Sequence, residues 1–490
     1  MNLSLIETEL KFQVPPESRA ALLRAVATVT AVTTRLQAVY ADTADRHLAA
    51  AGLALRLRKE GRFWVQTLKG RGDGLMQRQE HEVQRGAGAA IPALNAQLHA
   101  GTPVGDRLLG LLVSLGEGSA LQPIYRTDIR RLHRRVRHGG ALIELAYDRG
   151  FVIAGEQQAP VDEIEFELIR GPDAALIDLG QRWSLRFGLW WDVRTKSERG
   201  CRMALGLERV DAVKAELSAF KPDTPPAQAW AQMLAAALRQ ALTNAAEIAS
   251  GTGDPEHLHQ LRVALRRLRT ALRDFAPWSA APEAALALEV DWRKPFGQLG
   301  AVRDSDVLSH TLQPALEAAG APLLPPLQAG PAVDLGGFVR DAAFNTLLLR
   351  TLALCQEPAA AAARLPDAKA LVQPLWLRIK RELLAFAQAS TEDQHRLRKR
   401  TKRLRYALEA VQPLLKRKAG ERFLGALRHA LQALGDLNDL HVAQALYREQ
   451  AQGQPQAWFA VGYLAARQQA QLQEVARVLA RLHELMLPWR

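Results

Sequence analysis

The residues that could do chemistry first appear in the opening run IETELKF, where Glu7, Glu9 and Lys11 alternate with other side chains. Successive side chains of a β-strand point to opposite faces, so these three charged groups would share one face. Carboxylates are the ligands that Mg²⁺ or Mn²⁺ accepts, and an ammonium group binds phosphate oxygens. The alternative for such a face is the solvated side of an ordinary sheet.

The same alternation recurs through the first third of the chain, in LRLRK, TLKG, RQEHEV, YRTDIRR, LIELAYDRG and DEIEFEL. Basic strands lie among acidic strands, which favours a closed antiparallel barrel with a charged interior. Such an interior would bind polyanions through Arg and Lys and divalent metal through carboxylates. The alternating charged positions are Arg56, Arg58, Lys69, Arg78, Glu80, Glu82, Arg126, Asp128, Arg130, Glu144, Asp148, Glu163, Glu165 and Glu167.

The order of these segments, with YADT and the closing TKSERG, resembles the CYTH superfamily over roughly residues 1–205. That superfamily includes triphosphate tunnel metalloenzymes, adenylate cyclases and thiamine triphosphatases. The resemblance implies that magnesium or manganese is held by Glu7, Glu9, Asp148, Glu163 and Glu165. It implies that a phosphate chain is bound by Arg56, Arg58, Lys69, Arg126, Arg130 and Lys196. It also implies that Lys11, paired with Tyr40, activates a water molecule; a packed aromatic at the rim is the alternative for Tyr40.

This chemistry needs no nucleophile from the protein. Oxygen-ligated metal would polarise a phosphoryl group, basic side chains would neutralise its charge, and water would attack in line. The expected reaction is hydrolysis of inorganic triphosphate to phosphate and pyrophosphate. The alternatives are an adenylate cyclase, a thiamine or nucleoside triphosphatase, and a non-catalytic protein that binds polyphosphate or associates with polyphosphate granules.

The second half of the chain has a different spacing of apolar residues. From about residue 227 the apolar period changes from two to three and four, which is typical of amphipathic helices. A proline-rich segment, residues 219–228, separates the two stretches of different apolar spacing and predicts a linker. We therefore expect a two-domain α+β protein, with the barrel over residues 1–208 and an all-α domain over residues 229–490.

An internal repeat organises the helical half. HQLRVALRRLRTAL, from His259, aligns with HRLRKRTKRLRYAL, from His395. LGAVRDSDV, from Leu299, aligns with LGDLNDLHV, from Leu434. These matches predict a duplicated helical bundle with repeats over about residues 229–318 and 337–490.

Each copy presents a basic stripe beside an apolar stripe when it is placed on a helix. A solvated face is the ordinary explanation, but like charges at helical neighbours destabilise a helix unless an anion offsets them. This half resembles the CHAD domain, a duplicated helical module that binds inorganic polyphosphate along a basic groove. The resemblance implies polyphosphate contacts from His259, Arg262, Arg266, Arg269, His395, Arg398, Lys402 and Arg405, with Asp304 and Asp439 orienting arginines.

Composition agrees with anionic partners. The 490 residues carry a formal net charge of +13, with an isoelectric point near 10.0. Nucleic acid is the second candidate partner, but no stripe of aromatics interleaves the helical arginines. Cys201 and Cys355 fall in different expected domains, so a reducing compartment is expected rather than a disulfide. The sequence shows no signal-peptide pattern and no apolar run of membrane-spanning length, which predicts a cytoplasmic protein. Polyphosphate binding would add polyphosphate granules as an expected location.

Overall fold

The computed structural model describes residues 6–72, 74–216, 220–307, 312–322, 334–356, 365 and 367–489. The chain forms two compact units, which we call the barrel unit and the helical unit. The barrel unit comprises Met1–Val213, Leu242–His257 and Leu335–Gln356, and the helical unit comprises Lys214–Ala241, Leu258–Asp334 and Glu357–Arg490. Because the units do not divide at a single point of the chain, the expected boundary at residues 219–228 stays a prediction.

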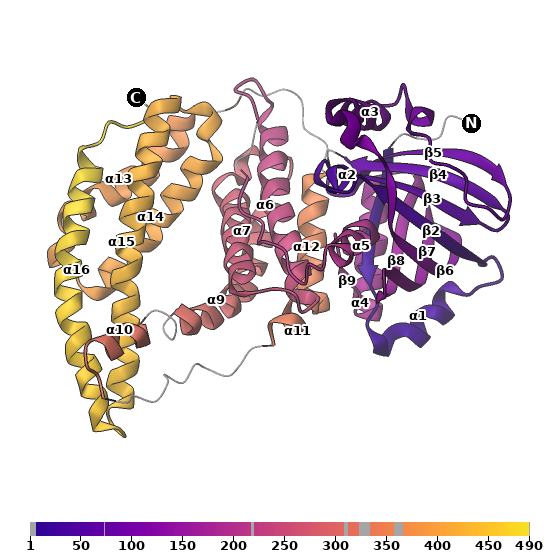
Figure 1. Ribbon diagram of the computed structural model, residues 1–490. Coiled ribbons are helices and arrows are strands. Elements are labelled where there is room, and N and C mark those ends of the chain that lie inside the picture. Colours follow the sequence, from indigo (N-terminus) through magenta and orange to yellow (C-terminus); the bar gives the residue numbers. More distant parts are fainter. Residues whose placement is uncertain are drawn as a thin grey trace. The chain divides into compact units, whose positions relative to one another are not determined.

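Strands β1 to β8 form one antiparallel sheet that closes on itself, as the sequence predicts (Figure 1). Their order is β5-β4-β3-β2-β6-β7-β8-β1, and pairing of β1 with β5 completes the barrel. A short ninth strand pairs with β1 beyond the closed ring. The strands are β1 (Ile6–Gln13), β2 (Val32–Asp42), β3 (Leu53–Glu60), β4 (Phe63–Arg71), β5 (Gln77–Ala87), β6 (Gln122–His138), β7 (Ala141–Ala154), β8 (Gln157–Arg170) and β9 (Trp190–Trp191).

Apolar side chains identify the outer face of the barrel. Leu10 and Phe12 of β1 are buried, and they approach Gly180 of helix α4 so closely that a Cβ there would lie 3.1 Å from the Leu10 side chain. The charged residues that alternate with Leu10 and Phe12 must therefore face the interior. The helices of this unit are α1 (Arg19–Val26), α2 (His47–Ala50), α3 (Pro103–Leu115), α4 (Asp173–Phe187), α5 (Lys196–Ala204) and α12 (Ala342–Cys355), with α11 (Leu335–Arg340).

Helix α5 packs against the inner face of β6 and β7. Thr195 and Glu198 form a capping box at its start, which fixes where the helix begins. At Gly200 an added Cβ would lie 2.2 Å from the ring of Tyr125, so glycine allows the close approach of helix and strand. This arrangement places the first residue of α5, Lys196, toward the interior of the barrel.

The barrel unit includes segments from the helical half of the sequence. Helix α12 packs on α4, and the Asn345 side-chain oxygen accepts a hydrogen bond of 2.8 Å from the backbone N–H of Trp191. Arg202 at the end of α5 donates two hydrogen bonds, of 3.0 and 2.7 Å, to the buried carboxylate of Glu247.

The helical unit carries both copies of the repeat on helices, as expected. The His259 and His395 segments lie on α7 and α14, and the Leu299 and Leu434 segments lie on α9 and α15. Helices α15 and α16 pack along each other, as do α13 and α14 (Figure 1). None of the helices in the described ranges is long and apolar enough to cross a membrane. The helices are α6 (Pro226–Ala249) and α7 (Pro255–Asp274), which cross between the units, and α8 (Pro282–Asp291), α9 (Arg293–Val307), α10 (Gln313–Ala318), α13 (Ala368–Leu384), α14 (Thr391–Ala410), α15 (Arg417–Gln450) and α16 (Trp458–Glu484).

Candidate functional site

Strand register shows which charged side chains face the barrel interior. Residues paired directly across neighbouring strands share a face, and Lys11 pairs with Glu165 while Arg131 pairs with Asp148. Extending this parity around the closed sheet gives one continuous charged face. Besides apolar residues of β2 and β6, it includes Tyr40 and the charged residues Glu7, Glu9, Lys11, Arg56, Arg58, Lys69, Arg78, Glu80, Glu82, Arg131, Arg135, Glu144, Asp148, Glu163, Glu165 and Glu167.

The centre of this face is an ammonium group surrounded by carboxylates. The Nζ atom of Lys196 lies 2.8 Å from Asp148, 2.5 Å from Glu163 and 2.8 Å from Glu165. Oxygens of the three acids lie within 4.8 Å of one another, close enough to ligate one metal ion. We call Asp148, Glu163 and Glu165 the carboxylate cluster.

The electrostatics keep two members of this cluster, Asp148 and Glu165, ionised. Burial opposes ionisation, but Arg131 and Lys196 together hold the pKa of Asp148 low and that of Glu165 well below its usual range. Arg131 contacts Asp148 at 2.7 Å and Glu165 at 2.5 Å. Despite its burial, Lys196 has a strongly raised pKa because Asp148 and Glu163 lie beside it. Three carboxylates that converge on one point are a donor set that fits Mg²⁺ or Mn²⁺.

Glu7 and Glu9 lie in a separate part of the interior face. Lys69 Nζ lies 2.7 Å from Glu7 and 2.9 Å from Glu80, and Arg78 lies 2.5 Å from Glu9. Burial raises the pKa of Glu7 although Lys69 opposes this effect. Among the residues that the structure describes, Glu7 and Glu9 do not join the carboxylate cluster. The five predicted metal ligands therefore form two groups.

Other acids on this face line the interior without joining the cluster. Burial and the nearby carboxylate of Glu7 raise the pKa of Glu167 to about 7. Arg58 lies 3.4 Å from Glu82, and Arg56 lies 4.0 Å from Glu80. The predicted phosphate-binding residues Arg56, Arg58, Lys69 and Lys196 thus share the interior face with these carboxylates.

Lys11 and Tyr40 share the interior face but do not contact each other. Lys11 lies 3.6 Å from Glu163 and donates to the backbone carbonyl of Arg194. Tyr40 accepts a 3.2 Å hydrogen bond from Arg56, and its ring stacks on that of Tyr125. Burial raises the pKa of Tyr40, but Arg56, with Lys196 and Lys69, outweighs it and lowers that pKa. Their joint role in water activation stays a prediction.

The structure corrects the prediction for strand β6. Arg126 and Arg130 pair with Val39 and Arg35 of β2 on the outer face, and both are exposed. The inward set on this strand is the other one, which begins at Tyr125 and includes Arg131. Alternation predicts two faces of a strand but not which face is interior. Because Arg130 and Arg131 are adjacent, either face of β6 would present an arginine to the interior.

A second candidate site is a cavity of about 570 Å³ in the helical unit. Five of the residues predicted to bind polyphosphate line it. They are Arg262 and Arg266 of α7, and His395, Arg398 and Lys402 of α14. Helix α15 supplies another part of the wall, including Asp439 and His441.

Two arginines lie beside glycines at equivalent positions of the two repeats. A Cβ at Gly300 would lie 3.7 Å from Arg262 Nη1, and a Cβ at Gly435 would lie 3.8 Å from Arg398 Nη2. Arg262 also donates to the backbone carbonyls of Leu299, at 2.5 Å, and Gly300, at 2.7 Å. The LG segments of the repeat thus accommodate the arginines that line the cavity.

Lys402 is the unusual cation of this cavity. Burial, together with Arg266 and Arg398, lowers its pKa to about 6, and Asp439 only partly opposes this effect. No ion pair joins Lys402 to any residue that the structure describes. A half-buried ammonium group among arginines favours an anionic ligand, because an anion would relieve the repulsion.

The remaining predicted polyphosphate contacts lie outside the lining of this cavity. Arg269 forms a 2.7 Å ion pair with Glu289, and Arg405 lies 3.3 Å from Glu409. His259 is on α7 but is not a lining residue. The Asp304 side chain lies outside the described part of the chain.

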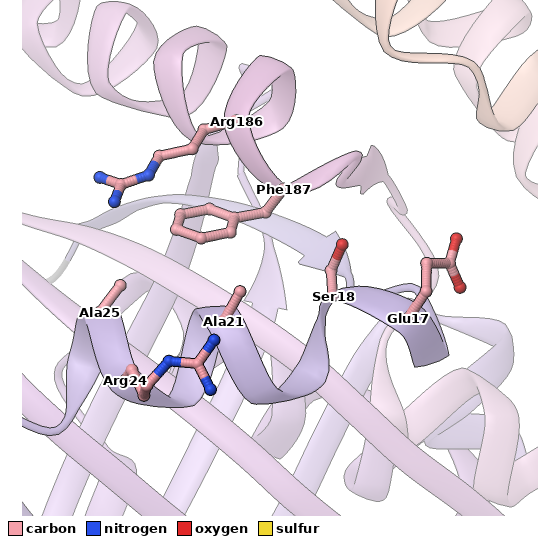
Figure 2. Close-up of a pocket in the computed structure, with 7 residues that line it drawn as sticks. All are labelled: Glu17, Ser18, Ala21, Arg24, Ala25, Arg186 and Phe187. Carbon is pink, nitrogen blue, oxygen red and sulfur yellow. The ribbon is translucent and has the colours of Figure 1, made fainter.

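A hollow of about 400 Å³ lies on the barrel unit between α1 and the end of α4. Figure 2 shows Arg24 and Arg186 on either side of the Phe187 ring, with Glu17 at the far end. None of its lining residues belongs to the interior face of the barrel.

Comparisons with known proteins match both halves. The CYTH domain model matches residues 5–199 and the CHAD domain model matches residues 232–448. An inorganic triphosphatase of Haemophilus influenzae is 32% identical over 206 residues, which cover 41% of this chain and 55% of that protein. The chain thus spans about half the length of this curated relative.

Two solved structures illustrate the likeness. The CHAD domain from the plant Ricinus communis is 31% identical, with 57% of this chain and 98% of that chain covered and a TM-score of 0.44. A putative adenylyl cyclase from Hippeastrum, described as having a dominant triphosphatase activity, is 18% identical, with 41% and 96% covered and a TM-score of 0.30. On the two family matches, the chain belongs to the proteins that join a CYTH domain, here residues 5–199, to a CHAD domain, here residues 232–448.

Proposed function

We propose that the barrel hydrolyses inorganic triphosphate to phosphate and pyrophosphate with Mg²⁺ or Mn²⁺. The observation that carries this proposal is the carboxylate cluster, which surrounds Lys196 and lies on one interior face with many cationic side chains. The name of the Haemophilus influenzae relative supports the same substrate.

The interior residues would divide the work. Asp148, Glu163 and Glu165 would hold the metal ion, which supplies charge neutralisation for the phosphate chain when bound. Lys196 would turn from these acids toward a phosphate oxygen once they are neutralised. The other cations of the interior would neutralise charge on the transferred phosphoryl group. They are Lys11, Arg56, Arg58, Lys69 and Arg131.

The test is phosphate release from inorganic triphosphate by the full chain with Mg²⁺ or Mn²⁺. Glu163→Gln and Lys196→Ala should each lower kcat about a hundredfold or more. Glu156→Gln, at the exposed turn between β7 and β8, is the matched control and should retain the activity of the unaltered protein. No release from the unaltered protein would refute the proposal. A panel of ATP and thiamine triphosphate, with detection of cyclic AMP, separates the alternative activities.

We propose that the helical cavity binds inorganic polyphosphate. The observation that carries this proposal is the convergence of Arg262, Arg266, Arg398 and Lys402 from both repeats on one cavity. Arginine and lysine are the side chains that bind phosphate oxygens. Such binding would localise the protein at polyphosphate granules in the cytoplasm.

Binding of labelled polyphosphate to the full chain tests this proposal. The double variant Arg398→Gln/Lys402→Gln should weaken binding about tenfold or more, while Lys418→Gln/Arg417→Gln, at the exposed start of α15, should not. Equal displacement of polyphosphate by DNA at matched phosphate concentration would instead indicate general polyanion binding.

A further inference from the structure

The outer face of the barrel carries arginines that the proposed lumen chemistry does not use. Arg35 of β2, Arg130 of β6 and Arg149 of β7 are paired directly across three neighbouring strands. Arg126 lies on the same outer face, four residues along β6 from Arg130. All four arginines are exposed, and the exposed fraction of the Arg35 side chain is 69%. We call them the outer arginine row.

Charge on this row is only partly balanced within the described structure, by Asp128 on the same face of β6 and by Asp162, which pairs across from Arg149. Arg35 forms a bidentate contact with Asp128, at 3.0 and 2.6 Å. No ion pair joins Arg126, Arg130 or Arg149 to another residue in the described ranges. Like charges directly opposite on neighbouring strands destabilise a sheet, so three arginines in one row favour an anionic partner. Arginine suits phosphate in particular, because its planar group binds two oxygens at once.

The basic surface continues from the row to the hollow between α1 and α4. Arg134, four residues beyond Arg130 on the same face of β6, donates a 3.1 Å hydrogen bond to the backbone carbonyl of Ala25, which lines that hollow. The hollow presents the exposed Arg24 and Arg186, with the Arg186 guanidinium 5.0 Å from the centre of the Phe187 ring (Figure 2). Glu17 is its acidic lining residue.

Aromatic surface accompanies these cations. Phe151 of β7 is 43% exposed and lies two residues from Arg149 on the same outer face. Phe187 lines the hollow, but its ring is buried and packs against Trp183. An inorganic phosphate chain has no group that could stack on an aromatic ring, whereas every nucleobase has a flat face that can stack. The exposed ring of Phe151 therefore favours nucleic acid over polyphosphate as the occupant.

We propose that the outer arginine row, with Phe151 and the adjacent hollow, binds single-stranded nucleic acid. The arginines contact the phosphate backbone, Phe151 stacks on a base, and the hollow receives a nucleotide. Because the row lies on the outside of the closed sheet, this surface is separate from the lumen that would hydrolyse triphosphate.

The test is fluorescence anisotropy of a labelled 12-nucleotide single-stranded RNA bound to the full chain over a series of salt concentrations. Arg126→Gln/Arg130→Gln should weaken binding about tenfold and reduce the magnitude of the salt slope by about 1.4, or ~0.7 per lost phosphate contact. Phe151→Ala should weaken it about fivefold or more. The control Arg417→Gln/Arg477→Gln removes the same charge from exposed positions on α15 and α16 and should leave affinity within about twofold.

A second measurement distinguishes RNA bound at the outer arginine row from RNA bound in the helical cavity. RNA containing 4-thiouridine should crosslink under ultraviolet light to peptides from β6 and β7. Crosslinks confined to α7 and α14 would overturn the proposal. Equal weakening by the control pair would overturn it as well. An unchanged affinity in Phe151→Ala, with polyphosphate competing equally at matched phosphate, would assign the surface to a phosphate chain instead.

Discussion

The ammonium nitrogen of Lys196 lies 2.8 Å from Oδ2 of Asp148, whose side chain is 1% exposed. The lysine comes from the first turn of α5 and the aspartate from the middle of β7, so the contact joins the helix to the inner face of the barrel. The same ammonium group lies against Glu163 and Glu165, and it occupies the position where oxygen ligands converge. Lys196 therefore balances the negative charge of the carboxylate cluster from within.

Replacement of Lys196 by methionine should expose this balance. Leaving these carboxylates, two of them buried, without their shared cation should lower the free energy of unfolding by about 3–5 kcal/mol at pH 7 without metal. Millimolar Mg²⁺ or Mn²⁺ should restore part of that loss, and EDTA should remove the gain. Thermal melts with and without metal measure both effects. Lys418→Met, at an exposed position, is the control, and an equal response to metal in both variants would contradict the assignment.

Arg131 is expected to matter for the reaction, although the resemblance assigned its role to Arg126 and Arg130. Arg131→Gln should lower kcat/KM for inorganic triphosphate about a hundredfold, since it removes a cation that contacts two acids of the site. Arg131→Lys should recover part of the activity because it keeps the charge. Steady-state phosphate release measures this.

The control for this comparison is Arg170→Gln, at the exposed end of β8. Circular dichroism melts should accompany the kinetics, because Arg131 also balances buried charge. Wild-type kcat/KM in Arg131→Gln would remove this residue from the reaction.

Much of the interior was predictable from the sequence, and β6 shows why the rest was not. Alternation correctly grouped Glu7, Glu9 and Lys11 on one face, because a strand has a fixed period. At Arg130 and Arg131 the period was equally clear, but the choice of face depends on what packs outside the sheet. That choice is made by tertiary contacts, which no local pattern contains.

The grouping of side chains was harder to predict than their direction. The resemblance named Lys196 and the carboxylates, yet it did not indicate that Lys196 would lie among Asp148, Glu163 and Glu165. Their contact depends on α5 packing inside the barrel, which Gly200 permits by its close approach to Tyr125. In the helical half, the repeat placed Arg398 and Lys402 on one face because both lie on one regular helix.

Gly435 is expected to tolerate a small side chain but not a large one. A Cβ there would lie 3.8 Å from Arg398 Nη2, an ordinary contact, and alanine favours the interior of a helix. Gly435→Ala should therefore raise the free energy of unfolding by about 0.5–1 kcal/mol in urea melts, with polyphosphate affinity unchanged. Gly435→Leu should displace Arg398 and weaken polyphosphate binding about tenfold. Equal affinity in the two variants would contradict this positioning of Arg398.

Lys402 should make polyphosphate binding depend on pH. Its pKa of about 6 in the empty cavity means that it is neutral at pH 8, and a bound polyanion would raise that pKa. Binding at pH 8 should then take up about one proton per site, which calorimetry in buffers of different ionisation enthalpy detects. Affinity should fall above pH 6, by up to about tenfold per pH unit.

The lowered pKa of Lys402 also makes the free energy of unfolding depend on pH, and proton linkage fixes the sign of that dependence. Lys402 has a pKa of about 6 in the folded chain and about 10.4 when unfolded, so the unfolded chain binds more protons between these values. The free energy of unfolding should therefore gain a component that rises with pH across that window. Lys402→Met should remove both this component and the proton uptake. Burial lowers the pKa of His441, the histidine that lines the same cavity on α15. Proton uptake that persists in Lys402→Met would assign it to another group and contradict the prediction.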